Sequence, residues 1–107
     1  MSEIVRRRRP SHPGAILRAH YLEARAIGVG EMAEAIGVSR KHMSQVVNGH
    51  KRIEPRLAAR LSKALGTTAL FWLHLQAAVD AWDAVEAEAK WRPSKSFVRR
   101  VDPARSP

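Results

Sequence analysis

The chain has no cysteine among its 107 residues. This absence excludes a disulfide framework and thiolate metal sites, and it makes a reducing cytoplasm the default compartment. No apolar run approaches the roughly 20 residues that span a bilayer. The arginine-rich start is not followed by the apolar region of a signal peptide. We therefore expect a cytoplasmic protein with no membrane partner.

Motifs for catalysis, cofactors and metals are also lacking. There is no phosphate-binding glycine loop and no nucleophile elbow, and Asp80 and Asp83 are typical of a solvated helix face. The histidines have no close ligand pair and no thiolate or paired carboxylate beside them. We expect no enzyme activity, no cofactor and no metal. These histidines are His12, His20, His42, His50 and His74.

Positive charge is what the chain has in excess. Nineteen basic residues against ten acidic ones give a formal net charge of +9. Residues 39–65 carry seven basic side chains and one acidic one, whereas residues 66–89 carry four acidic side chains and no basic one. A concentrated positive segment favours a polyanionic partner, because neutralised phosphates release condensed counterions. The alternative is that the charge serves only solubility.

Helix start and stop signals divide the chain into five helices with no strand pattern. Pro13 suits a first helical position, and Gly28 and Gly30 are expected to end that first helical region. A second helix is expected at about Val29–Ile36, followed by Gly37 in a left-handed turn.

Three further helices follow. Ser39 is expected to cap the third, which ends at Asn48 and Gly49. The fourth begins at Pro55 and stops at Gly66, and the fifth runs from a cap at Thr67 or Thr68 to about Ala89. The predicted fold is an all-α domain over residues 11–89. It lies between a flexible basic arm, residues 1–10, and a basic tail, residues 90–107.

The third helix has one apolar side and one polar side. Met43, Val46 and Val47 share the i, i+3, i+4 stripe that anchors a helix to a core. Lys41, Ser44, Gln45 and Asn48 face away from this stripe. Two short helices joined by a tight glycine turn form a helix-turn-helix, whose second helix can lie in a DNA major groove. Helix pairs of this kind also occur in purely structural bundles, which is the alternative.

DNA-contacting roles follow from side-chain chemistry. Arg40 and Lys41 can donate to guanine or to phosphate, Gln45 can form two bonds with adenine, and Ser44 is permissive. A second group is expected at phosphates around the helix ends: Ser39, His42, Asn48, Lys51 and Arg52. Arg56 and Arg60 are either phosphate contacts or solvated charge, and Asn48 could simply help to close the helix before Gly49.

Four stretches, from Pro13 to about Trp82, together resemble the HigA-type antitoxins of the phage-repressor (XRE) helix-turn-helix family. They are HPGAILRAHYL, MAEAIGVSRKHMSQVVNG, RLAARLSKALGTT and LFWLHLQAAVDAW. The resemblance implies a dimeric five-helix repressor that binds its own promoter. It also implies neutralisation of a HigB-like toxin, an mRNA-cleaving nuclease of the RelE type.

The fifth helix carries a wide apolar face that suggests dimerisation. Phe71, Leu75, Ala78 and Trp82 form one stripe, with Trp72 and Val79 beside it. A small domain has little interior for two tryptophans, so we expect a second copy to cover part of this face. The alternative is burial within one chain. Two-fold symmetry would place two recognition helices about 34 Å apart and would require a palindromic operator.

Two other classes of function remain open. The chain could act mainly by protein binding through acidic residues of the fifth helix, or its arginine arm and tail could bind RNA. Phe97 and Trp91 offer the tail little aromatic surface for stacking bases. A plain repressor of the same family without a toxin partner is a further alternative.

Overall fold

The computed structural model describes residues 8–99 of the chain. Within this range it contains five α-helices and one π-helical segment and no strand, which confirms the predicted fold class. The outer parts of the predicted arm and tail, residues 1–7 and 100–107, lie outside the described residues. The elements are α1 (Pro13–Ile16), η1 (Leu17–Glu23), α2 (Val29–Ile36), α3 (Arg40–Val47), α4 (Pro55–Leu65) and α5 (Ala69–Ala87).

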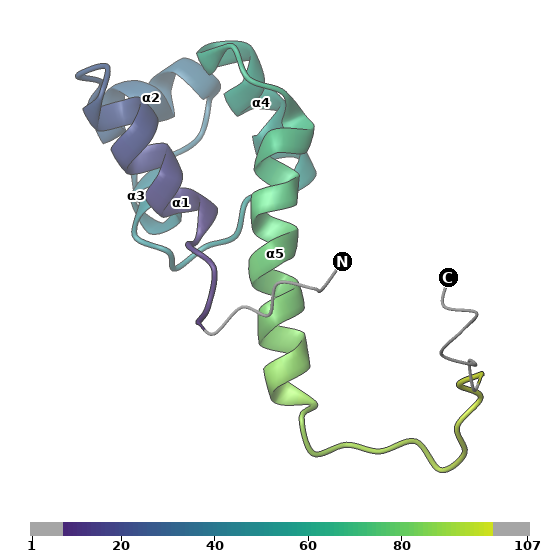
Figure 1. The fold of residues 1–107 in the computed structure, drawn as a ribbon. Helices are drawn as coiled ribbons and strands as arrows, with labels where there is room; N and C mark the ends of the chain where they lie inside the picture. Colours follow the sequence, from purple (N-terminus) through teal and green to yellow (C-terminus); the bar gives the residue numbers. More distant parts are fainter. Residues whose placement is uncertain (1–7, 100–107) are drawn as a thin grey trace.

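The helices form a small group with one long member. α2 packs mainly on α3, α4 packs mainly on α5, and α1 contacts both α3 and α5. α5 runs beside the other helices, and its lower half extends past them (Figure 1). No helix in the described range is both long and apolar enough to cross a membrane.

The first helix differs from the predicted regular one. It changes after Ile16 into the π-helical segment η1, in which hydrogen bonds from i to i+5 widen the turn. Leu17 and Leu22, which are five residues apart, are both buried, and the wider turn suits this spacing. The helix also ends at Glu23 rather than at Gly28 or Gly30. Gly28 is instead the N-cap of α2, and Gly30 lies inside α2.

The turn between α2 and α3 contains the glycine and the serine cap that the sequence predicts. Gly37 has a φ of 73°, a left-handed conformation that glycine adopts without a steric penalty. Ser39 then caps α3, its hydroxyl accepting a hydrogen bond from the His42 backbone N–H at 3.0 Å. α2 and α3 therefore meet through a short turn that contains glycine, as predicted.

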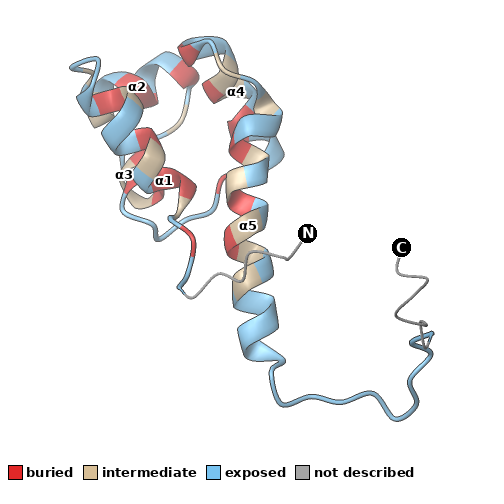
Figure 2. Ribbon diagram, in the orientation of Figure 1, coloured by how far each residue is buried: buried red, intermediate tan, exposed pale blue. Residues whose placement is uncertain are grey.

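The core lies where the helices meet. Buried apolar residues line the inner sides of all the helices, whereas the lower end of α5 is exposed (Figure 2). α3 contributes Met43, Val46 and Val47 to this core, and Met43 and Val46 are completely buried. The apolar stripe predicted for the third helix is therefore the stripe that anchors it.

α1 approaches α3 so closely that no side chain fits between their backbones. Gly14 is buried, and a Cβ atom added to it would overlap the carbonyl oxygen of Val46. Glycine is thus required here by proximity to a neighbouring backbone.

Trp72 and Val79 lie inside the chain, which corrects their expected role at a dimer interface. Trp72 has no exposed surface and Val79 has only 2%. The Trp72 indole N–H donates to the Thr67 hydroxyl at 2.7 Å, and its ring packs against Tyr21 and Phe71. The buried side of α5 is therefore formed by Trp72, Gln76 and Val79 and not by the predicted stripe.

We predict that Gly14→Ala destabilises the fold by about 1 to 3 kcal/mol, because α1 and α3 must separate to admit a methyl group. Urea unfolding at neutral pH would measure the loss. Gly30→Ala is the matched control, since Gly30 is the second residue of α2, as Gly14 is of α1, and a Cβ there would make only an ordinary contact at 3.6 Å. Equal unfolding midpoints for the two variants would contradict the close contact.

The second prediction concerns His12, whose Nδ1 accepts the Gly14 N–H at 2.9 Å as the N-cap of α1. Burial, followed by the charge of nearby Arg9, lowers the pKa of His12. The unfolded chain, with a histidine pKa of about 6.5, then binds the proton more readily. Stability is therefore lost as the pH falls from about 6.5 through the lower pKa of the folded state.

His12→Asn retains a capping acceptor and removes the titration. We expect wild type to lose more stability than this variant between about pH 7.5 and pH 5.5. Urea unfolding of both proteins at each pH measures the difference. Parallel losses would show that His12 does not titrate in this way.

Candidate nucleic-acid interface

α3 presents its polar side chains outside the core. Lys41 and Asn48 are exposed, and Ser44 and Gln45 are half-buried. The buried stripe on the opposite side fixes how the helix is rotated, so these four positions face away from the core in a defined direction. The helix is thus held by apolar packing and leaves donors and acceptors for a polar partner.

The N-terminal end of α3 is built from Ser39 and Arg40. The Ser39 hydroxyl accepts the His42 N–H, which leaves its own proton free to donate. Arg40 is exposed, and its side chain runs along α2 at Gly30: a Cβ on that glycine would lie 3.6 Å from the Arg40 Cδ. Arg40 therefore extends from the edge of α3 that faces α2.

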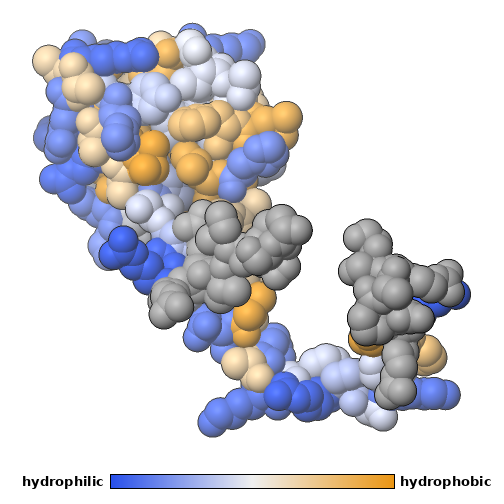
Figure 3. All heavy atoms as spheres, viewed as in Figure 1, coloured by the Kyte–Doolittle hydropathy of each residue, from blue (hydrophilic) through white to orange (hydrophobic). Residues whose placement is uncertain are grey.

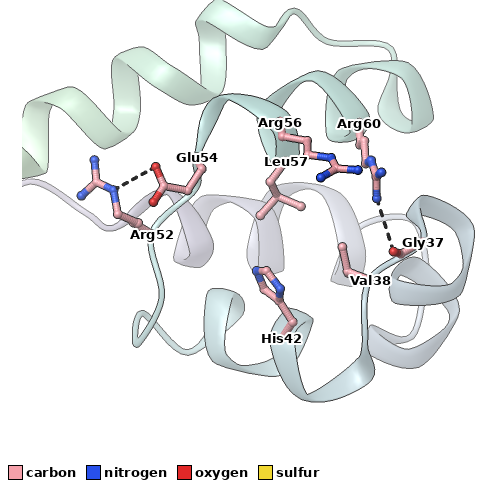
Figure 4. Close-up of a pocket in the computed structure, with 8 residues that line it drawn as sticks. All are labelled: Gly37, Val38, His42, Arg52, Glu54, Arg56, Leu57 and Arg60. Atoms are coloured by element: carbon pink, nitrogen blue, oxygen red, sulfur yellow. Dashed lines mark hydrogen bonds and ion pairs between the residues drawn. The ribbon is translucent and has the colours of Figure 1, made fainter.

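The opposite edge of α3 borders a groove of about 470 Å³. His42 points into it from α3, facing Leu57, and Arg56 and Arg60 lie along α4 above it (Figure 4). The remaining lining residues are Gly37, Val38, Arg52 and Glu54. The groove thus lies beside the polar side of α3 and is lined by three arginines and one glutamate.

Arg60 has a structural role that its sequence context did not show. Its Nη1 donates to the carbonyl oxygens of Ile36 at 3.0 Å and Gly37 at 3.3 Å. These carbonyls end α2, where no further helical N–H can reach them. Neither predicted role for Arg60, phosphate contact or solvated charge, describes this cap on α2.

Arg52 is bound within the chain. Its Nη1 and Nη2 donate to the two carboxylate oxygens of Asp80 at 2.9 and 2.5 Å, and its Nε lies 3.5 Å from Glu54. The hydrogen bond from Arg52 lowers the pKa of Asp80 and the same bond raises that of Arg52. Two carboxylates thus offset the charge of this arginine, which ties the loop after α3 to α5.

A second arginine pairs one turn further along α5. Arg9 donates to Asp83 through Nε at 2.8 Å and Nη2 at 2.9 Å, and this bond lowers the pKa of Asp83. Pro10 beside it is buried. The described end of the predicted flexible arm therefore lies against α5. Asp80 and Asp83 remain partly exposed, with 41% and 51% of their side-chain surface accessible, as expected from the sequence, and both also form ion pairs that the sequence did not predict.

Gln76 joins this region from inside the core. It is only 4% exposed, and its Oε1 accepts the Ile53 N–H at 2.8 Å. Its Nε2 donates to Asp80 at 3.1 Å. Sequence reasoning missed this residue, although a glutamine between Trp72 and Val79 on an apolar helix face is a signal for a buried polar contact.

Three residues of the predicted dimer interface on α5 form a stripe that is still partly exposed. Phe71 is 37% exposed, and Leu75 and Trp82 are half-buried. Apolar residues gather over the upper half of α5 on the face shown in Figure 3. Trp72 and Val79 lie beneath this surface, so only Phe71, Leu75 and Trp82 of the predicted set can meet a second copy.

Comparison with known proteins supports the sequence-based resemblance. Residues 24–73 match the helix-turn-helix family model. The chain is 42% identical over 76 residues to the HTH-type transcriptional regulator YbaQ of Escherichia coli, covering 71% of this chain and 67% of the relative. It is 41% identical over 88 residues to antitoxin HigA-1 of Vibrio cholerae, covering 79% of this chain and 83% of the relative.

Solved structures agree with these relatives. Antitoxin HigA of Pseudomonas aeruginosa with the higBA promoter superposes with a TM-score of 0.74 and 34% identity, covering 77% of this chain and 89% of that chain. Antitoxin GraA in complex with its operator gives a TM-score of 0.72 and 31% identity, covering 81% and 88%. This chain therefore belongs to the HigA-type antitoxins of the XRE helix-turn-helix family.

Proposed function

We propose that this protein binds DNA sequence-specifically and represses its own promoter. The observation that carries the proposal is the construction of α3, in which three buried apolar anchors hold a polar side outward. Relatives of the same fold have been solved with a promoter and with an operator. The positive charge of residues 39–65 supports a duplex as the partner.

Base contacts are proposed for the outward side chains of α3. Gln45 suits adenine, because its amide can donate to N7 and accept from the N6 amino group. Lys41 and Arg40 suit guanine O6 and N7, and Arg40 reaches the duplex from the α2 edge. Ser44 adds one hydroxyl between them.

Phosphate contacts are proposed on both sides of this set. Ser39 and His42 lie at the N-terminal end of α3, and Asn48 and Lys51 lie at and beyond its C-terminal end. Arg52 differs from them, because Asp80 and Glu54 already offset its charge. We propose that Arg52 mainly holds the loop in place and contacts phosphate only through the N–H groups left over.

Gln45→Ala tests the base contacts. We expect it to cost about 1 to 3 kcal/mol on the preferred duplex and to relax the choice of base at one position. Binding to the upstream region and to a set of single-base variants, titrated by fluorescence anisotropy, measures both effects.

Lys51→Ala is the matched control, because a phosphate contact weakens binding to all sequences and reduces the salt slope by about 1. Equal weakening by Gln45→Ala on every duplex would reject its base contact. Absence of any sequence preference in the wild type would reject the proposed function.

A homodimer is proposed on the stripe formed by Phe71, Leu75 and Trp82. Large aromatic side chains that stay partly exposed after folding mark candidate interfaces, and they often dominate the binding energy. A two-fold axis beside α5 would present two copies of α3 to successive turns of the major groove. The operator would then be palindromic.

We predict that Trp82→Ala weakens this dimer by about 2 kcal/mol, or roughly 30-fold in the dissociation constant. Sedimentation equilibrium would measure the shift toward monomer. Leu70→Ala is the control, since Leu70 is 61% exposed on the same helix and, as the residue before Phe71, points about 100° away from the stripe. Circular dichroism would establish that both variants are folded. An unchanged dimer in Trp82→Ala would place the interface elsewhere.

We further propose that the protein is the antitoxin of a type II module and neutralises a HigB-like, RelE-type mRNA-cleaving toxin by direct binding. Membership of the HigA-type family supports this proposal. The second candidate is a repressor without a toxin partner, favoured by relatives named only as HTH-type regulators. An adjacent reading frame whose product arrests growth alone, but not together with this chain, would decide for the antitoxin.

A further inference from the structure

Arg18 links the first helix to the end of the recognition helix. It lies on η1, and its Nη1 donates to the Oδ1 of Asn48, the C-cap residue of α3, at 3.3 Å. Glu23 holds the same guanidinium, accepting from its Nε at 3.3 Å. Gly14 lies one turn earlier, where α1 rests on the backbone of α3. The close contact between the helices therefore brings Arg18 within reach of Asn48.

The side chain of Asn48 contacts Ser44 as well as Arg18. Arginine has only donors, so the amide oxygen of Asn48 must face it, and the amide nitrogen then points away. That nitrogen, Nδ2, donates to the Ser44 Oγ at 3.4 Å. A Ser44 hydroxyl that accepts from Asn48 keeps its own proton free to donate. The chain of contacts thus selects one of the two orientations open to the amide.

We propose that Arg18 is a positioning residue for DNA recognition, which fixes the Asn48 amide so that Ser44 meets the duplex as a hydrogen-bond donor. A donor in the major groove favours acceptors such as purine N7, guanine O6 or thymine O4. With Arg18 removed, the amide can turn over and offer its oxygen to Ser44, whose hydroxyl then points inward as a donor. Discrimination at the base pair facing Ser44 falls. The inference rests on the proposed function.

Arg18 affects recognition more than folding. Its side chain is 55% exposed, and Glu23 is more exposed still. Exposed ion pairs and hydrogen bonds of this kind contribute little to stability. Arg18 also lies before residues 24–73, which match the helix-turn-helix model. The residue therefore acts on the motif from outside it.

The contact can be tested without DNA. Asn48 is the single asparagine of the chain, and Gln45 and Gln76 are its two glutamines, so only three side-chain amides appear in a ¹⁵N NMR spectrum. Arg18→Met removes every donor and keeps a long side chain. We expect the Asn48 amide signals to shift and its heteronuclear NOE to fall. Arg18→Lys, which retains a donor, should restore both, and Arg56→Met, distant on α4, should change neither.

The effect of Arg18 on DNA recognition is tested by comparing the binding of duplexes that differ at single base pairs. Ser44→Ala first identifies the base pair whose discrimination depends on Ser44. We expect Arg18→Met to lower discrimination at that pair about fivefold, as for loss of one hydrogen bond. The salt slope should stay unchanged, and the double variant Arg18→Met, Asn48→Ala should match Asn48→Ala alone.

Several results would overturn the inference. Uniformly weaker binding with a shallower salt slope would make Arg18 a phosphate contact. Additive effects in the double variant would also reject the proposal, as would unchanged NMR signals of the Asn48 amide. The proposal also fails if Ser44→Ala leaves base discrimination unchanged at every position of the duplex. A normal sequence preference that Arg18→Met leaves intact overturns this inference alone. A wild type with no preference among duplexes overturns the proposed function as well.

Discussion

The contact between Gly14 and the backbone of Val46 is the constraint on which the arrangement of this domain depends. Because no side chain separates α1 from α3, the first helix lies directly on the recognition helix. Val46 belongs to the buried stripe of α3, so the contact acts on the anchored side of that helix. The same approach lets η1 place Leu17 and Leu22 in the core and brings Arg18 to the exposed end of α3.

Several basic residues of the domain act within the chain rather than on a partner. Arg60 caps α2, Arg52 ties the loop after α3 to Asp80, and Arg9 binds Asp83. The ion pairs of Arg52 and Arg9 offset part of the positive charge that a sequence count assigns to DNA binding, whereas Arg60 keeps its charge. α3 still presents Arg40 and Lys41 on its surface, and Arg56 lines the groove beside His42.

Features governed by neighbouring residues were predictable from the sequence. The Ser39 cap, the left-handed Gly37 and the apolar stripe of α3 depend on a few adjacent positions, and all three were predicted. Contacts between distant residues were not. Arg52 and Asp80 are 28 residues apart, and Arg9 and Asp83 are 74 apart. The burial of Trp72 likewise depends on how α5 is rotated against α4 and the first helix, which helical periodicity alone leaves undecided.

The buried amide of Gln76 ties the loop after α3 to the long helix α5. Its bond to the Ile53 backbone lies inside the core, where water cannot replace it. In the proposed dimer, a change in the angle at which two α5 helices cross would therefore also move the loops that follow the two α3 helices. The spacing of the operator half-sites would then depend on the angle at which the two subunits pack. A protein that binds α5 would change the spacing of the two α3 helices on DNA without contacting the duplex.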